Sequence, residues 1–232
     1  MMIHHCAHEG REGNRKHLPS KKKDLTTHMI LVVDRSGSMG GIQKPMQDAI
    51  NTQLNEALKA GNTKVSVVEF DDVPVVCEWE VEPGSFDYVL EPRGWTAMLD
   101  GVGVALDYYK GSKNKYDTYL MIIISDGYEN FSKKETYETI AAKIKDLTGT
   151  GKWTFSYIGA NQDLSDISRK MNIPIMNTMS YVADQRGTRV MAAAAAGSSQ
   201  SYFAGRAQGM TASANFVNSN LPENKKEKVS NA

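Results

Sequence analysis

Two short apolar runs in this sequence are each followed at once by polar and acidic residues. Residues 29–33 are all apolar and stop at Asp34, and residues 119–124 are apolar and stop at Ser125 and Asp126. A fully apolar run of this length is typical of a strand that is buried on both faces. The pattern therefore predicts two buried strands with acidic ends.

Segments with helical spacing separate the predicted strands. Apolar positions three and four residues apart predict helices at 42–58, with Gly61 and Asn62 as the stop, and at 96–109, closed by Gly111. Ser132 and Glu135 form a capping-box pattern for a helix at 133–147. Further elements are helices at 164–171 and at 188–208, which is rich in alanine and has Thr188 as its cap, and strands at 65–70, 73–81, 153–158 and 173–176.

This alternation of strands and helices predicts an α/β fold with a mainly parallel six-stranded sheet and helices on both faces. Asp71 and Asp72 leave only a tight connection before the strand at 73–81, which carries Pro74 and is therefore expected to be an antiparallel edge strand. Residues 82–95 are expected to form a loop with one helical turn at 86–90.

The same pattern divides the chain into three parts. Residues 1–27 have almost no apolar periodicity and are expected to form a disordered extension. Residues 28–208 form the predicted domain, and residues 209–232 are expected to be a flexible tail.

Composition narrows the classes of function. Lys plus Arg and Asp plus Glu both number 27 among the 232 residues, so no net charge attracts nucleic acid or an anionic membrane. We find no apolar stretch long enough to cross a bilayer and no apolar segment of a signal peptide, which favours a cytoplasmic protein. Cys6 and Cys77 are expected to be free thiols, and the His and Cys residues near the N-terminus are not expected to form a stable metal site.

The acidic strand ends are the main candidates for chemistry. Parallel sheets bind ligands beyond the carboxyl ends of their strands, where Asp34 and Asp126 would lie if their strands are neighbours. Two adjacent carboxylates need a cation or a shared proton. The hydroxyls of Ser36, Ser38 and Thr96 offer further oxygens, and an oxygen-only set favours Mg²⁺, with Mn²⁺ as an alternative.

These residues resemble the motif of a known family. The segment from Asp34 to Ser38, Asp-Arg-Ser-Gly-Ser, resembles the DxSxS signature of the von Willebrand factor A (vWA) domain family. Thr96 and Asp126 are similar to the threonine and aspartate of the family's second and third metal loops, so that the motif of the metal-ion-dependent adhesion site (MIDAS) is complete. The resemblance runs from about residue 28 to about residue 205.

The resemblance implies a doubly wound sheet, a metal ion on its upper rim and no catalytic activity. Ser36, Ser38 and Thr96 would be metal ligands, directly or through water, while Asp34 and Asp126 would mostly orient coordinated waters. Members of the family bind proteins, and an Asp or Glu carboxylate of the partner often completes the metal's shell. Intracellular members often work beside AAA+ ATPases or in larger machines.

Two other classes of function stay open. Paired acids with Mg²⁺ also support phosphoryl transfer, although Arg35 is the only cation in the motif and the 5 histidines all precede Met29. A scaffold that assembles through the small-residue helix at 188–208 is the other alternative. Trp95 is expected to be either an exposed contact residue or a buried plug. Glu129 and Asn130 either border the site or are solvated, and solvation is the favoured expectation.

Overall fold

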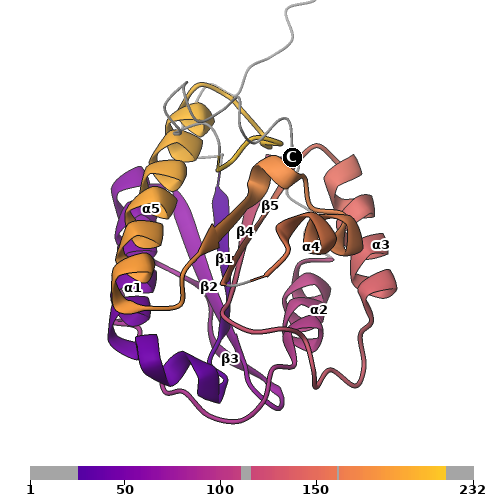
Figure 1. Cartoon of the computed structure of the whole chain (residues 1–232). Coiled ribbons are helices and arrows are strands. Elements are labelled where there is room, and N and C mark those ends of the chain that lie inside the picture. The colour runs from indigo at the N-terminus through magenta and orange to yellow at the C-terminus, as the bar shows by residue number, and fades with distance from the viewer. Residues whose placement is uncertain (1–25, 111–115, 161, 218–232) are drawn as a thin grey trace, which may run out of the picture.

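A six-stranded sheet runs through the middle of the protein in the order β3-β2-β1-β4-β5-β6 (Figure 1). The computed structural model describes residues 26–110, 116–160 and 162–217. β3 is antiparallel to β2, and all other neighbouring strands are parallel, which confirms the predicted α/β class, sheet and edge strand. The strands are β1 (Thr27–Asp34), β2 (Thr63–Phe70), β3 (Pro74–Val81), β4 (Thr118–Ser125), β5 (Trp153–Ala160) and β6 (Thr178–Tyr181).

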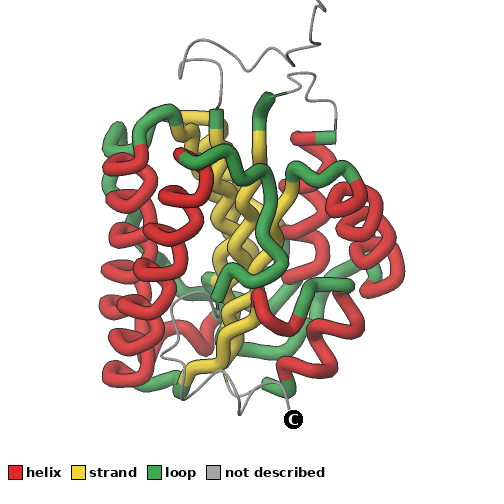
Figure 2. The backbone as a smooth tube through the Cα atoms, turned by 90° about the horizontal axis from the view of Figure 1, so that it is seen from above, coloured by secondary structure: helices red, strands yellow, loops and turns green. Residues whose placement is uncertain are grey.

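Helices cover both faces of the sheet and give the protein three layers (Figure 2). One face carries α1 (Gln43–Ala60) and α5 (Gln185–Ala207), which lie together on the left in Figure 1. The other face carries α2 (Met98–Tyr109), α3 (Tyr137–Gly149) and α4 (Leu164–Met171). Two short 3₁₀ helices, η2 (Gly37–Ile42) and η3 (Ile175–Asn177), complete the set. Among the described residues, no helix has both the length and the apolar character to span a membrane.

The central strands are apolar throughout because both of their faces are covered. Leu31 packs into the core beneath α1 and α5, whereas its neighbour Val32 packs into the core beneath α2, α3 and α4. Ile122 and Ile123 divide in the same way on β4. Successive side chains of a strand point to opposite faces, so each apolar run supplies two cores at once.

The order of the strands places a topological switch point between β1 and β4. The chain goes from β1 to the β2 and β3 edge and then crosses back to β4, so the two central strands are parallel neighbours. Val33 is opposite Ile124, and the carboxyl ends of both strands therefore meet at the same rim. Open α/β sheets bind their ligands at such a point.

Two helices begin at other residues than predicted. Helix α3 begins at Tyr137 with Thr136 as its N-cap, and the predicted start after Ser132 is wrong. The backbone N–H groups of residues 133–135 donate to the Asp100 carboxylate instead of opening a helix. Helix α5 begins at Gln185 because Asp184, and not Thr188, caps it.

The last strand also lies later in the chain than predicted. The prediction at 173–176 is wrong, because Asn172 has a left-handed backbone with φ 55° at the end of α4 and a 3₁₀ turn follows at η3. The Asn177 side chain then donates to the Phe155 carbonyl at 2.9 Å, which ties this turn to β5 before β6 begins at Thr178.

The loop before α2 contains no helical turn at 86–90, contrary to the prediction. The Asn51 side chain on α1 bonds both the N–H and the carbonyl of Tyr88, each at 2.9 Å, and so holds the backbone in an extended form. Helix α2 begins at Met98, two residues after Thr96, and ends at Tyr109. The predicted stop at Gly111 lies outside the described residues.

The folded part continues beyond the predicted boundary at residue 208. Phe216 is buried, and its N–H donates to the Asn177 side chain at 2.6 Å. The Ser213 N–H donates to Thr154 at 2.8 Å, and the Val217 N–H donates to the Met176 carbonyl. Residues 210–217 thus pack on the domain, whereas 1–25 and 218–232 lie outside the described residues.

Candidate metal centre

The rim at the switch point gathers the polar residues that follow β1 and β4. Asp34 ends β1, Ser36 and Ser38 follow it in the loop and in η2, and Asp126 comes directly after β4. The Ser36 and Ser38 hydroxyls lie 3.0 Å apart, and the Ser38 hydroxyl donates to an Asp126 carboxylate oxygen at 2.6 Å. Segments 88 residues apart in sequence therefore form one chain of oxygen atoms.

Asp34 is fully buried beneath this chain. One of its oxygens accepts from the Ser36 N–H at 2.7 Å, and the other accepts from the Ser125 hydroxyl at 2.6 Å. Burial raises the pKa of Asp34 to about 6, although the hydrogen bonds from Ser125 and Ser36 act in the opposite direction. Burial also raises the pKa of Asp126. Both carboxylates therefore lie where a nearby positive charge would stabilise their ionised form.

Thr96 approaches the same rim from the loop before α2. Thr96 is buried. Its hydroxyl and the Ser38 hydroxyl both lie close to Gly127, because a Cβ atom placed on this glycine would be 3.6 Å from the Thr96 hydroxyl and 3.8 Å from the Ser38 hydroxyl. The two hydroxyls therefore flank Gly127, the residue after Asp126. The Thr96 N–H donates to the Asn130 side chain at 3.0 Å, which fixes the backbone at this position.

The loop after Asp126 is held by side chains that were expected to be solvated. Asn130 bonds Thr96, and Glu129 accepts from the N–H groups of Leu99, Phe131 and Ser132 at 2.7 to 2.9 Å. Glu129 is only partly exposed, so the expectation of solvation is wrong for this residue, whereas Asn130 is exposed as expected and in addition accepts from the Thr96 N–H. A polar residue in a loop has no periodicity that reveals such a role, and only its tertiary neighbours define it.

Arg35, between Asp34 and Ser36, points away from the rim into a buried charge network. Its guanidinium lies 3.1 Å from Glu69 and 2.7 Å from Asp71, and all three side chains are buried. Tyr88 donates to the other Glu69 oxygen at 2.6 Å. Burial opposes ionisation of Asp71, but bonds from Arg93 and Val73 and the charge of Arg35 lower its pKa. The network joins the loop after β1 to the β2–β3 hairpin.

The chemistry of these residues fits a hard divalent cation. In the described part of the chain, no three His, Cys, Asp or Glu side chains converge to hold a metal, so hydroxyls would have to complete a site at this rim. The Tyr181 hydroxyl at the end of β6 is buried without a hydrogen-bond partner. Burial and then the charges of Asp126 and Asp34 raise its pKa, which shows that it lies near both acids. A hydrated cation would suit such a group of acids and hydroxyls and could supply a partner for the Tyr181 hydroxyl.

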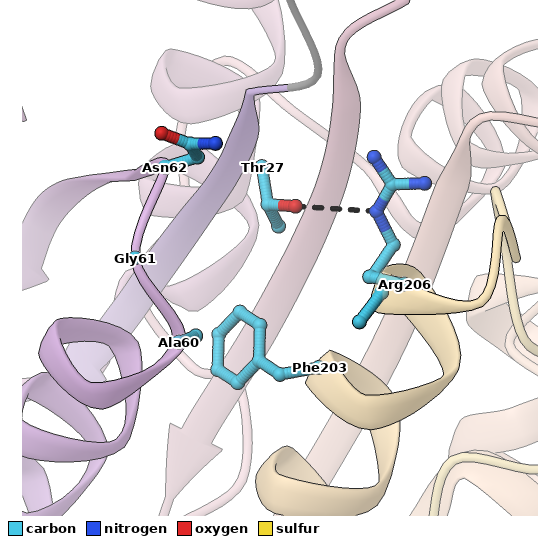
Figure 3. Close-up of a pocket in the computed structure, with 7 residues that line it drawn as sticks. Thr27, Ala60, Gly61, Asn62, Phe203 and Arg206 are labelled. Atoms are coloured by element: carbon cyan, nitrogen blue, oxygen red, sulfur yellow. Dashed lines mark hydrogen bonds between the residues drawn. The ribbon is translucent and has the colours of Figure 1, made fainter. Parts of the chain in front are cut away.

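A pocket of about 140 Å³ lies at the other end of β1, away from this rim (Figure 3). It is bounded by Thr27 and by the C-terminal ends of α1 and α5. Arg206 donates to the Thr27 hydroxyl at 3.2 Å and to the Met210 carbonyl. The negative ends of two helix dipoles meet a buried guanidinium here, so we assign Arg206 a structural role.

Comparisons with known proteins concern the fold. No protein-family model and no curated protein matches the sequence. Among solved structures, proximal thread matrix protein 1 from the mussel byssus, determined with a zinc-occupied MIDAS motif, has a TM-score of 0.55 and 15% identity over 73% of this chain and 47% of that chain. The pilus adhesin SpaC from Lactobacillus rhamnosus GG has a TM-score of 0.59 and 12% identity over 77% of this chain and 31% of that chain.

A von Willebrand factor type A protein from Catenulispora acidiphila has a TM-score of 0.49 and 12% identity, over 76% of this chain and 43% of that chain. The chain thus spans less than half the length of each of these three proteins. At such identities, only the fold is comparable. The sheet order, the antiparallel edge strand and the neighbours together give this chain a vWA-like fold.

Proposed function

We propose that this protein is a non-catalytic binding module that holds a divalent metal ion and captures an acidic residue of a protein partner through it. Asp34, Ser36, Ser38, Thr96 and Asp126 would hold the ion. When bound, the metal supplies a positive position that a partner's Asp or Glu carboxylate can occupy. The proposed partner class follows from the resemblance of these residues to the vWA motif.

One observation carries the metal site. The hydroxyls of Ser36 and Ser38 and the carboxylate of Asp126 form a continuous chain of contacts directly above a second, fully buried carboxylate, Asp34. Two acids at one rim repel each other unless a cation or a proton lies nearby. Oxygen donors favour Mg²⁺, with Mn²⁺ as the alternative. A MIDAS motif can also hold zinc, as in the mussel protein.

The surroundings of the rim argue against phosphoryl transfer. Arg35, the cation of the motif, is occupied by Glu69 and Asp71 and is therefore unavailable as a phosphate clamp. Among the described residues, the histidine nearest in sequence is His28, which lies at the opposite end of β1 and contacts Asp117 at 3.2 Å. No histidine in the described part of the chain thus lies at this rim to act as a general base.

The arrangement of α5 argues against assembly through its small residues. Ala195, Ala196 and Ser199 are buried inside the protein, and the Ser199 hydroxyl donates to Gln53 on α1 at 2.6 Å. The small residues thus serve to bring α5 close to α1. A cytoplasmic location and an AAA+ ATPase as partner remain predictions from the sequence.

Titration calorimetry with MgCl₂ and MnCl₂ tests the metal site. We expect saturable binding by the protein and a loss of at least tenfold in affinity for Ser38→Ala and Thr96→Ala, because each removes one oxygen donor. Thr52→Ala on α1 removes a hydroxyl far from the rim and should bind like the parent. Absence of saturable binding by either metal would refute the proposed site.

A further inference from the structure

A group of aromatic side chains adjoins the candidate metal centre. We call Trp95, Tyr128 and Phe131 the aromatic ridge. Trp95 precedes Thr96, and Tyr128 follows Gly127, so the ridge grows from the two loops that carry the second and third parts of the metal motif. The side chains of Trp95 and Tyr128 are both 61% exposed. Exposed aromatic residues of this size are enriched at the centres of protein interfaces.

The backbone around Trp95 forces its ring outward. Gly94 has φ 70°, a conformation that suits glycine, and its carbonyl accepts from the Gly37 N–H at 3.1 Å. The Trp95 N–H donates to Asp72 at 2.6 Å, and the Thr96 N–H donates to Asn130. With both neighbouring peptides held, Thr96 points inward and Trp95 points to solvent.

The Trp95 ring is also held from the side. It stacks on Phe131 with ring centroids 6.4 Å apart and an interplanar angle of 8°. The Phe131 N–H donates to the Thr96 carbonyl at 3.2 Å, which ties this second ring to the same backbone. The Trp95 ring therefore has one parallel aromatic neighbour and leaves most of its surface open to a partner.

The metal loop itself contains an open stretch. Gly40 and Gly41 are exposed, and a Cβ atom added to either would meet nothing within 4 Å. A partner segment can therefore approach the metal loop closely on the glycine side, whereas on the ridge side it meets flat apolar rings. In a bound partner segment, the side chain next to the metal-binding Asp or Glu would therefore point towards the aromatic ridge.

The outer flank of the aromatic ridge carries positive charge. The Lys133 ammonium lies 4.5 Å from the centroid of the Phe131 ring, and Lys134 beside it is exposed. The acids nearby, Asp72 and Glu129, are engaged by backbone N–H groups. An acidic partner segment is therefore complementary to this flank and, when a metal ion is bound, to the metal loop as well.

We infer that the rim selects a partner segment in which the metal-binding Asp or Glu is next to an aromatic residue that stacks on Trp95. This inference rests on the proposed function and specifies the partner's chemistry. The carboxylate alone would give any acidic loop access to the metal. The ridge adds a contact that only a segment with a planar apolar neighbour can make.

Two capped tetrapeptides test this inference in the full chain. One has phenylalanine directly after its aspartate, and the matched peptide has glycine there. Binding is followed by the NMR shifts of the Gly40 and Gly127 backbone N–H groups, which every variant keeps, in 10 mM MgCl₂ and again in EDTA. We expect the phenylalanine peptide to bind about fivefold more tightly in MgCl₂. Trp95→Ala should remove this preference, whereas Tyr108→Ala, which removes an exposed ring at the far end of α2, should keep it.

The outcomes separate the two proposals. Equal, Mg²⁺-dependent binding of both peptides would overturn the role of the ridge and leave metal-dependent capture intact. A preference that persists in Trp95→Ala would also overturn it. If neither peptide binds although Mg²⁺ does, carboxylate capture itself is wrong, and the inference falls with it. Thermal unfolding should change little in Trp95→Ala, because the ring is exposed and the backbone bonds remain.

Discussion

Removing the charge of Asp34 should stabilise the protein when no metal is present. Asp34 is fully buried, and burial raises its pKa from 3.8 to about 6. Because the folded value lies above that of the unfolded chain, protonated Asp34 favours the folded state. This contribution is complete below pH 3.8 and is lost as the pH rises through about 6. The difference between the two pKa values corresponds to about 3 kcal/mol in the free energy of unfolding.

Urea unfolding of the parent and of Asp34→Asn, followed by circular dichroism in EDTA between pH 4 and pH 8, measures this contribution. Asparagine can still accept from the Ser36 N–H, and the Ser125 hydroxyl can turn to the Gly127 carbonyl, which it already contacts at 3.0 Å. The free energy of unfolding of Asp34→Asn relative to the parent should therefore rise by about 2.4 kcal/mol between pH 4 and pH 7. Asp48→Asn, on the exposed part of α1, is the control for loss of a carboxylate elsewhere.

Adding Mg²⁺ should remove most of this difference in stability at neutral pH. A metal concentration of about 100 times Kd stabilises the folded parent by about 2.7 kcal/mol, and the variant should gain much less because it has lost one negative charge of the site. A difference between Asp34→Asn and the parent that does not change with pH would refute the argument that burial of this carboxylate is costly. Equal gains from Mg²⁺ would show that Asp34 does not support the metal.

Three further substitutions test the supports of the rim and of the fold. Gly94→Ala should lower the free energy of unfolding by about 1 to 2 kcal/mol in urea, because φ is 70° and the new Cβ would lie 2.8 Å from Asp72; an unchanged midpoint would contradict this. Arg35→Met should cost about 3 to 5 kcal/mol by the same assay, since it removes the buried cation shared by Glu69 and Asp71, and a loss below about 1 kcal/mol would argue against the network. Thr136→Ala should cost about 1 kcal/mol and speed hydrogen exchange in the first turn of α3, whereas equal exchange rates would exclude Thr136 as the cap.

The sequence predicts the two central strands well because their apolar runs are unambiguous. The runs before Asp34 and Asp126 are apolar on both faces, and such runs have few other structures open to them. Their acidic ends meet because parallel neighbouring strands end at the same rim. The contacts among Asp34, Ser36, Ser38 and Asp126 thus follow from one topological step, the crossover to β4.

The errors have a common physical cause. Helix starts and turns are decided by which side chain takes each free backbone N–H group, and several of these partners come from distant segments. Asp100 on α2 takes the N–H groups after Ser132, and Asn177 joins β5 to residues 213–216. Tyr181 reaches the acids only because β6 packs beside β5. Local patterns contain no trace of such long-range bonds.

The edges of the sheet limit how this protein can associate with itself. At one edge, β3 begins with Pro74 and contains an irregular register near Glu80, whose φ is 50°. At the other edge, β6 has only 4 residues. Neither edge offers the long, regular row of free N–H and carbonyl groups that another sheet needs for pairing. At high concentration, polymerisation by strand addition is therefore disfavoured, so multivalent assembly would have to use side-chain surfaces.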